Sequence, residues 1–337
     1  MAEHFDLVVH GGTVLDPSQG LHARRDVGLR GGKVATLAED LSAAEAERRL
    51  DARGLLVTPG LLDIHTHLYW GVSHYGIEPD PHCLARGVTT AVDAGTSGAQ
   101  TFPAFRRFII QQSDTRVLAL LNLSAMGMIY EGVGELQDLR YADVDFAVRV
   151  AREHPGLIVG LKVRMGEPIV GDQGVPALRL ARQAADQLGG LPIMIHLSQT
   201  IVPLAEILAH LERGDLATHC YHGWEHGILD ERGQFVPAAR AAAERGVLFD
   251  VGHGMGSFKW EVARQGIAQG FLPGTISSDI HAHSVRFPAV DLVTTLSKLL
   301  HLGLSLEQVV ARATSLAAAA VGGSSTWARS DPGRRAT

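Results

Sequence analysis

Apolar runs of strand length alternate with longer amphipathic segments over most of this chain. From residue 61 onward, eight runs have the nearly continuous apolar character of buried strands: residues 61–65, 87–92, 117–121, 157–163, 192–196, 216–219, 246–251 and 274–277. Amphipathic helices fit between them, for example over residues 175–188, 202–213 and 235–245. This alternation predicts an α/β fold, a (β/α)8 TIM-like barrel. A doubly wound open sheet is the structural alternative, because periodicity alone does not separate the two.

The two ends of the chain follow other patterns. Residues 1–58 contain short apolar runs joined by Gly-Gly pairs, which predicts a small antiparallel β domain of hairpins. Residues 305–321 predict one helix, and the polar, basic residues after it show no strand pattern. We therefore expect a small β domain over residues 1–58, a barrel over 59–321 and a disordered tail over 322–337.

Composition narrows the possible partners and the compartment. The net charge is −6 and no basic stripe is present, which argues against nucleic acid and anionic membranes as partners. No apolar run approaches the roughly 20 residues needed to span a bilayer, and the N-terminus lacks a signal-peptide pattern. Only two cysteines occur, so no disulfide framework is implied. We expect a cytoplasmic protein that acts on a small molecule.

A pair of histidines follows the first barrel run. His65 and His67 are two residues apart, and side chains at this spacing in a strand point the same way. Neutral imidazole is a common metal ligand, so the pair predicts a metal site at the end of this strand. The alternative is two polar side chains where a strand leaves the core.

Four more polar residues stand at the ends of other predicted strands: Lys162, His196, His219 and Asp279. In a barrel these strand ends face one bowl, where barrel active sites lie. Each residue has an ordinary explanation as a solvated or hydrogen-bonded polar group, and Asp279 could cap the next helix. If these residues had no common role, all four explanations would have to apply at once, in addition to the alternative for the histidine pair. One shared site is the simpler interpretation.

The chemistry of this set suits two divalent ions, with Zn2+ expected and Mn2+, Fe2+ or Co2+ possible. His65, His67 and Asp279 would hold one ion, and His196 and His219 the other. Two metals would repel a lysine ammonium, whereas a neutral Lys162 amine adds CO2 to form a carbamate that bridges both ions. The alternative is a cationic Lys162 in a salt bridge, with one metal or none.

Such a centre predicts hydrolysis of an amide or ester. Two metals acidify a shared water to give a bridging hydroxide nucleophile. Asp279 would orient that water, take its proton and pass the proton to the leaving group.

With these residues in this order, the chain resembles the amidohydrolase superfamily, in particular its binuclear, carboxylated-lysine members. Residues 93–98, 160–166 and 249–258 resemble its amidohydrolase/deacetylase branch, whose members are often called dihydroorotase-like. The resemblance implies a distorted barrel beside a small β-sandwich, a homo-oligomer, and acetylated hydroxy or amino acids as substrates. Relatives complete the sandwich after the last helix, and a matching segment is missing here. The resemblance therefore implies that residues 1–58 form only half of a β-sandwich, and that the tail over 322–337 is disordered or aberrant.

Four further residues are candidates for substrate contacts: Tyr69, Arg164, His222 and His253. The guanidinium fork of Arg164 suits a substrate carboxylate but could equally pair with a structural aspartate. Tyr69 could line the bowl or pack beneath a loop, and the two histidines lie on predicted loops after strands.

We expect deacetylation of a small acetylated hydroxy or amino acid. The alternatives are hydrolysis of a cyclic amide, as in dihydroorotase or hydantoinase, a deaminase-like enzyme with one metal, and a catalytically silent barrel scaffold.

Overall fold

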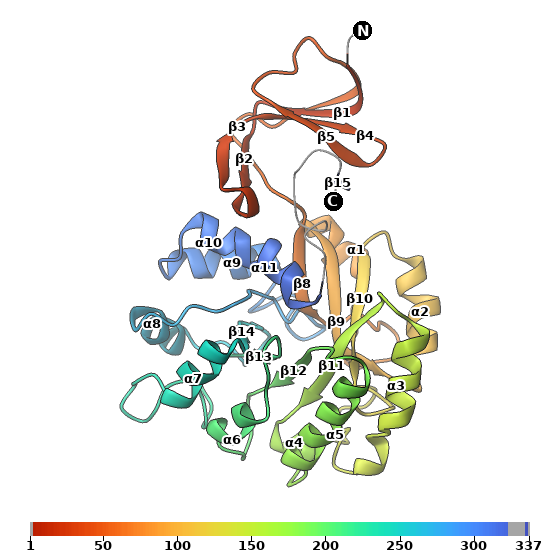
Figure 1. The fold of residues 1–337 in the computed structure, drawn as a ribbon, viewed down its shortest axis with the longest axis vertical. Helices are drawn as coiled ribbons and strands as arrows, with labels where there is room; N and C mark the ends of the chain where they lie inside the picture. The colour runs from red at the N-terminus through yellow and green to blue at the C-terminus, as the bar shows by residue number, and fades with distance from the viewer. Residues whose placement is uncertain (1–2, 323–333, 336–337) are drawn as a thin grey trace.

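The computed structural model describes residues 3–322 and 334–335 of the chain. Figure 1 shows a helix-covered barrel with a small β domain at one end. The remaining residues, 1–2, 323–333 and 336–337, lie outside the described part of the chain, and so does most of the predicted tail over 322–337. The predicted boundaries of the three parts remain predictions.

Seven parallel strands form the barrel sheet, in the spatial order β14-β13-β12-β11-β10-β9-β8. The longer strands are buried on both faces, as expected of a parallel sheet covered by helices. The strands of this sheet are β8 Leu61–Thr66, β9 Val88–Gly98, β10 Arg116–Asn122, β11 Ile158–Arg164, β12 Ile193–His196, β13 Leu216–Thr218 and β14 Leu248–Asp250.

The eighth strand of the barrel is reduced to two parallel bridges. Thr275 pairs with the end of β14, and Ile280 pairs with the end of β8, so the segment between them closes the ring. Within it, Ser277 and Ser278 donate their hydroxyl groups to buried aspartates of β14 and β8. These side-chain bonds take the place of a regular ladder. The prediction of a strand over 274–277 is therefore wrong, whereas the TIM-like barrel is confirmed.

Most α-helices of the described chain connect the barrel strands or cover their outer face (Figure 1). The helix predicted over 175–188 is present almost unchanged, and those over 202–213 and 235–245 are shorter. The helices are α1 Pro79–His82, α2 Phe102–Phe108, α3 Val144–Glu153, α4 Glu167–Val170, α5 Gly174–Gln187, α6 Leu204–Ala209, α7 Pro237–Arg245, α8 Trp260–Ala268, α9 Leu292–His301, α10 Leu306–Arg312 and α11 Ser315–Ala320.

Two helices replace the single one predicted over 305–321. The backbone leaves helical geometry at Thr314, between α10 and α11. The carbonyl groups of Arg312 and Ala313 accept hydrogen bonds from barrel amides instead of continuing a helix. After this break, the alanines of α11 pack against apolar side chains inside the barrel, including Leu62 and Leu118. Their small side chains let α11 close one end of the barrel interior.

The N-terminal domain contains two small sheets. Strands β1, β4 and β5 are antiparallel, as predicted, but β6 pairs with β1 and β7 with β2 in parallel. The prediction of a purely antiparallel domain is therefore wrong. In addition, β15 pairs antiparallel with β5, so part of the C-terminal tail does form a strand. The strands are β1 His4–His10, β2 Thr13–Asp16, β3 Leu21–Arg24, β4 Asp26–Arg30, β5 Lys33–Ala38, β6 Glu45–Asp51, β7 Leu56–Val57 and β15 Arg334–Arg335.

No helix within residues 3–322 and 334–335 has the length and apolar character needed to cross a bilayer.

Candidate metal centre

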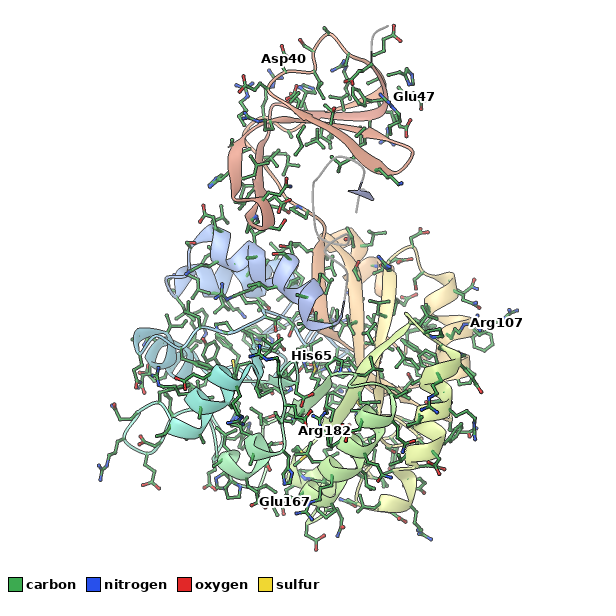
Figure 2. The ribbon with its side chains drawn as sticks, viewed as in Figure 1. Asp40, Glu47, His65, Arg107, Glu167 and Arg182 are labelled. Atoms are coloured by element: carbon green, nitrogen blue, oxygen red, sulfur yellow. The ribbon has the colours of Figure 1, made fainter. Side chains whose placement is uncertain are left out.

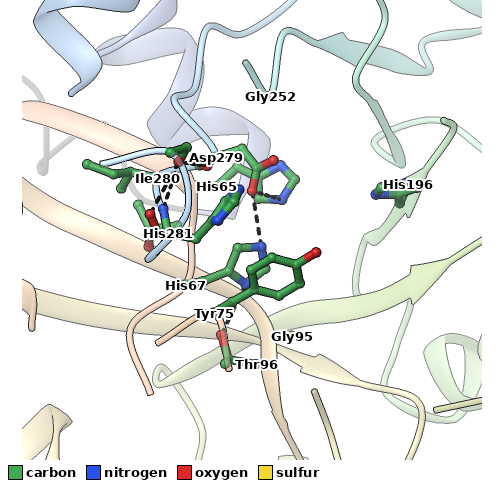
Figure 3. A network of polar contacts seen from close by, with 12 residues as sticks. His65, His67, Tyr75, Gly95, Thr96, His196, Gly252, Asp279, Ile280 and His281 are labelled. Atoms are coloured by element: carbon green, nitrogen blue, oxygen red, sulfur yellow. Dashed lines mark hydrogen bonds and ion pairs between the residues drawn. The ribbon is translucent and has the colours of Figure 1, made fainter. Parts of the chain in front are cut away.

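The histidine pair at the end of β8 meets Asp279 from the segment that closes the barrel. Oδ1 of Asp279 lies 3.3 Å from Nε2 of His65 and 3.1 Å from Nε2 of His67. Figure 3 shows both contacts, and Figure 2 shows His65 deep within the barrel while Arg107 and Glu167 lie at its surface. All three side chains are buried, and each offers a ligand atom within 4.8 Å of the others. This group could hold a metal ion.

The two other predicted histidines lie beside this group. The ring centroids of His196 and His219 are 4.4 Å apart, and those of His65 and His219 are 5.0 Å apart. Nε2 of His196 is 2.7 Å from the Ser198 hydroxyl, which leaves Nδ1 as the available ligand atom. His219 places Nδ1 2.6 Å from the Gly252 carbonyl, which leaves Nε2. The four histidines therefore present ring nitrogens in one region.

Burial keeps these imidazoles neutral. It lowers the pKa of His219 to about 3, and it lowers the pKa values of His65, His67 and His196 well below their usual range. A neutral imidazole has a free lone pair, which is the form that binds a metal. The donor set of buried imidazoles and a carboxylate therefore fits a divalent ion such as zinc.

Lys162 is completely buried among these groups. Its Nζ lies 3.2 Å from Nε2 of His65 and 3.3 Å from the sulfur of Met194. None of the ion pairs within the described residues involves Lys162. Burial lowers the pKa of this amine to about 7, so a large share of it is neutral at neutral pH. The predicted alternative, a cation held in a salt bridge, is not what the structure shows.

Two glycines let the backbone approach the centre closely. A Cβ on Gly254 would lie 2.3 Å from Oδ2 of Asp279, and Gly254 has a φ of +53° that favours glycine. A Cβ on Gly95 would lie 2.6 Å from Cγ of Lys162. Because ordinary Cβ contacts are longer than 3 Å, any larger residue at either position would displace a side chain of the centre.

Replacing Gly254 by alanine should therefore damage the site while leaving the barrel intact. Gly254→Ala pushes the Asp279 carboxylate away from the two histidines, and a misplacement of about 1 Å at a reacting group costs about 100-fold in rate. We expect a loss of this size in kcat, measured on the best substrate of the parent. Gly270→Ala is the matched control, because Gly270 also has a positive φ, of +81°, nothing lies within 4 Å of a Cβ there, and it does not line the cavity. Equal rates for the two variants would contradict the prediction.

A cavity of about 390 Å³ opens above these groups. All six predicted metal ligands line it, together with residues that the sequence analysis missed, including Tyr75, His281 and His283. The ring of Tyr75 stacks on His67 at 5.5 Å and contacts His281 edge-on at 4.6 Å, as Figure 3 shows. A sequence signal for two of these residues existed, because 281 and 283 repeat the His-x-His spacing of the first strand.

Only one of the four predicted substrate contacts lines this cavity. Arg164 does, but its guanidinium makes two hydrogen bonds of 2.7 Å to the carboxylate of Glu135. A structural aspartate was the alternative partner expected for this arginine, and the structure shows a glutamate in that role. The fork is therefore already occupied by a buried acid, and it is not free to pair in the same way with a substrate.

The structure places the other three outside the cavity lining. Tyr69 is buried against Phe105, and its hydroxyl donates to the Thr101 carbonyl. His253 stacks on Phe258 and accepts a hydrogen bond from Lys298. Neither side chain is among the residues that line the cavity, so their contact with a substrate stays a prediction.

His222 is the third of these residues, and it lines a neighbouring, more open hollow. This hollow lies between the loop after β13 and α8. The Trp224 amide donates to Nδ1 of His222. Trp224 itself lines both the hollow and the metal cavity.

Comparisons with known proteins identify relatives that match most of this chain. No family model matches the chain. A protein named deacetylase from Agrobacterium fabrum is 39% identical over 84% of this chain and 70% of its own length. Another deacetylase, from Enterococcus faecalis, is 33% identical over 92% of this chain and 82% of its own.

Two solved structures have the same fold as this chain. The crystal structure of an adenine deaminase has a TM-score of 0.91 and 31% identity, covering 98% of this chain and 88% of that one. The crystal structure of a dihydroorotase has a TM-score of 0.89 and 35% identity, covering 98% of this chain and 86% of that one.

Proposed function

The chain belongs to the amidohydrolase superfamily and is a metal-dependent amidohydrolase, and we propose that it removes the acetyl group from a small acetylated hydroxy or amino acid. The observation that carries this proposal is the meeting of six predicted side chains in one cavity, with a buried Lys162 that forms no ion pair within the described residues. The volume of the cavity is within the range of small-molecule sites.

We assign the ligands of two divalent ions, expected to be Zn2+, as follows. His65, His67 and Asp279 would hold one ion, and His196 and His219 would hold the other. Lys162, as a carbamate, would be a ligand that both ions share. This carbamate forms when the neutral amine adds CO2 and releases a proton, which the lowered pKa of Lys162 favours. It converts a buried cation into an anionic ligand.

The bound ions would supply an acidified water and a polarised acyl carbonyl. Asp279 acts as the base, because its carboxylate lies at the centre of the ligand group and borders the cavity. It accepts a proton from the water as the new carbon–oxygen bond forms. It then returns this proton to the leaving oxygen or nitrogen as the acyl bond breaks, which releases acetate and an alcohol or amine.

Two observations favour deacetylation. Two relatives that cover 84% and 92% of this chain are named deacetylases, and a shorter match of 52% identity over 103 residues is named N-acyl-D-glutamate deacylase. Hydrolysis of a cyclic amide is the second candidate. It is supported by the dihydroorotase structure and by relatives named dihydroorotase.

A hydrolysis screen of the metal-reconstituted protein tests the proposal. The panel contains acetylated hydroxy acids, N-acetyl D- and L-amino acids, cyclic amides and adenine, with acetate release, ring opening and ammonia release as separate measurements. We expect acetate release to dominate. Ring opening alone would establish the cyclic amidase instead, and ammonia release with one metal per chain would establish a deaminase. A protein that holds two metals but turns over nothing would be a silent scaffold.

A further inference from the structure

A threonine and an aspartate form a chain of hydrogen bonds that ends at Nδ1 of His65. Nδ1 of His65 lies 3.0 Å from the Thr218 hydroxyl, which donates to Oδ2 of Asp250 at 2.7 Å. Asp250 also accepts hydrogen bonds from the hydroxyl groups of Thr275 and Ser277. All of these side chains are buried. Three donated hydrogen bonds to one carboxylate fit its ionised form, which can only accept.

His67 has the same arrangement, built from different strands. Its Nδ1 lies 3.1 Å from the Thr96 hydroxyl, which donates to Oδ2 of Asp93. Asp93 also accepts from the backbone amides of Leu68 and Thr96, at 2.7 and 2.8 Å. Figure 3 shows the contact between His67 and Thr96. We call each histidine–threonine–aspartate chain a hydroxyl relay.

The direction of the hydrogen bonds in a hydroxyl relay fixes the histidine tautomer. A threonine hydroxyl has one hydrogen, and in both relays the aspartate receives it. The hydroxyl oxygen must therefore accept from the Nδ1–H of the histidine. The proton is then on Nδ1, and the Nε2 lone pair is free on the side that faces Asp279. An imidazole supported by a carboxylate in this way is also a more basic metal ligand.

The other two histidines lack such support. The partner of His219 is the neutral backbone carbonyl of Gly252, and the partner of His196 is the hydroxyl of Ser198. Within the described residues, the Ser198 hydroxyl is next bonded to that of Ser257, at 3.4 Å, and not to a carboxylate. The two halves of the centre therefore differ in the groups that orient their ligands.

We propose that the two hydroxyl relays make the His65–His67–Asp279 site the tighter of the two metal sites, so that it fills first. This proposal rests on the binuclear centre proposed above. Thr218, Asp250, Thr96 and Asp93 are positioning residues, because they act through the two histidines and do not reach the cavity. The anionic ligand Asp279 adds to the same asymmetry, whereas a carbamate on Lys162 would serve both sites equally.

Zinc titration of the metal-free protein, with bicarbonate present and a chromogenic chelator as competitor, measures both affinities. We expect two classes of site in the parent. Thr218→Val and Thr96→Val keep the shape of the side chain but remove the hydroxyl. Each should weaken the tighter class about 10–100-fold and leave the weaker class within about threefold. Thr218→Ser and Thr96→Ser keep the hydroxyl and should restore the parental affinity.

Thr275→Val is the matched control. It removes an equally buried hydroxyl from the same Asp250 carboxylate, but this hydroxyl does not contact a histidine. We expect its tighter class to stay within about threefold of the parent. Should a valine variant fail to fold, Asp93→Asn and Asp250→Asn, which disturb the same relays, should show the same selective loss.

The outcomes separate this inference from the proposed function. Two sites of equal affinity in the parent would overturn the inference while leaving the binuclear centre standing. So would valine variants that bind like the parent, serine variants as weak as valine, or a Thr275→Val variant as weak as Thr218→Val. A parent that binds no zinc would overturn both.

Discussion

Replacing Asp279 by asparagine should lower kcat by about 10²–10⁴-fold while the protein keeps its fold. The amide retains the size and one oxygen of the carboxylate, so the contacts with His65 and His67 need little rearrangement. It has lost the basic site that accepts a proton from water, and general acid–base catalysis is typically worth a factor of this size. The measurement is kcat on the best substrate of the parent, with metal content and thermal unfolding recorded on the same sample.

Two comparisons make this result specific to proton transfer. Asp145→Asn, an exposed acid in the first turn of α3, should turn over substrate like the parent. In Asp279→Asn, kcat should fall far more than KM changes, because the lost interaction belongs to the transition state. Parental turnover by Asp279→Asn would show that another group handles the proton.

The ligand set could be predicted from sequence because parallel strands impose a simple rule. His65, Lys162 and His196 lie at or within a few residues of the ends of β8, β11 and β12, and the ends of adjacent parallel strands lie together. The chain order of the residues and the strand order of the sheet then place the side chains near one another. The alternation of side chains along a strand likewise predicts that His65 and His67, at the end of β8, point the same way.

The cavity wall could not be predicted in the same way, since it depends on how loops turn. Tyr69 and Tyr75 follow the same strand, yet the first is buried under a loop and the second stacks on His67. No periodicity distinguishes them. The Arg164–Glu135 pair joins residues 29 positions apart, with no pattern to connect them.

The hydroxyl relays and the interrupted eighth strand could not be predicted from the sequence, for another reason. Threonine is common in strands, so Thr218 and Thr96 carry no signal until the fold brings them to a histidine. The segment around Ser277 has the composition of a strand, but its hydroxyl bonds to buried aspartates replace regular pairing. Tertiary contacts therefore decided both features, and local sequence could not reveal them.

Removing the Lys162 amine should have the largest effect of any substitution. Lys162→Ala eliminates the group that would carry the bridging carbamate, and it leaves a space in the buried centre. We expect the metal content to fall from two ions per chain to one or none, with kcat reduced by more than about 10⁴-fold because the paired-metal chemistry is lost. Elemental analysis and steady-state kinetics measure the two effects.

A small carboxylate should partly rescue this variant, and that rescue distinguishes a carbamate from an ordinary lysine. Propionate can enter the vacated space and offer two oxygens to the metals, so added propionate should restore both metal binding and turnover. Lys33→Ala, which removes an exposed lysine from β5, is the control and should need no rescue. A Lys162→Ala protein that retains two metals without propionate would show that no carbamate bridges them.

For the parent, reconstitution with metal and bicarbonate should accelerate as the pH rises through about 7. The pKa of Lys162 lies there, and only its neutral amine reacts with CO2.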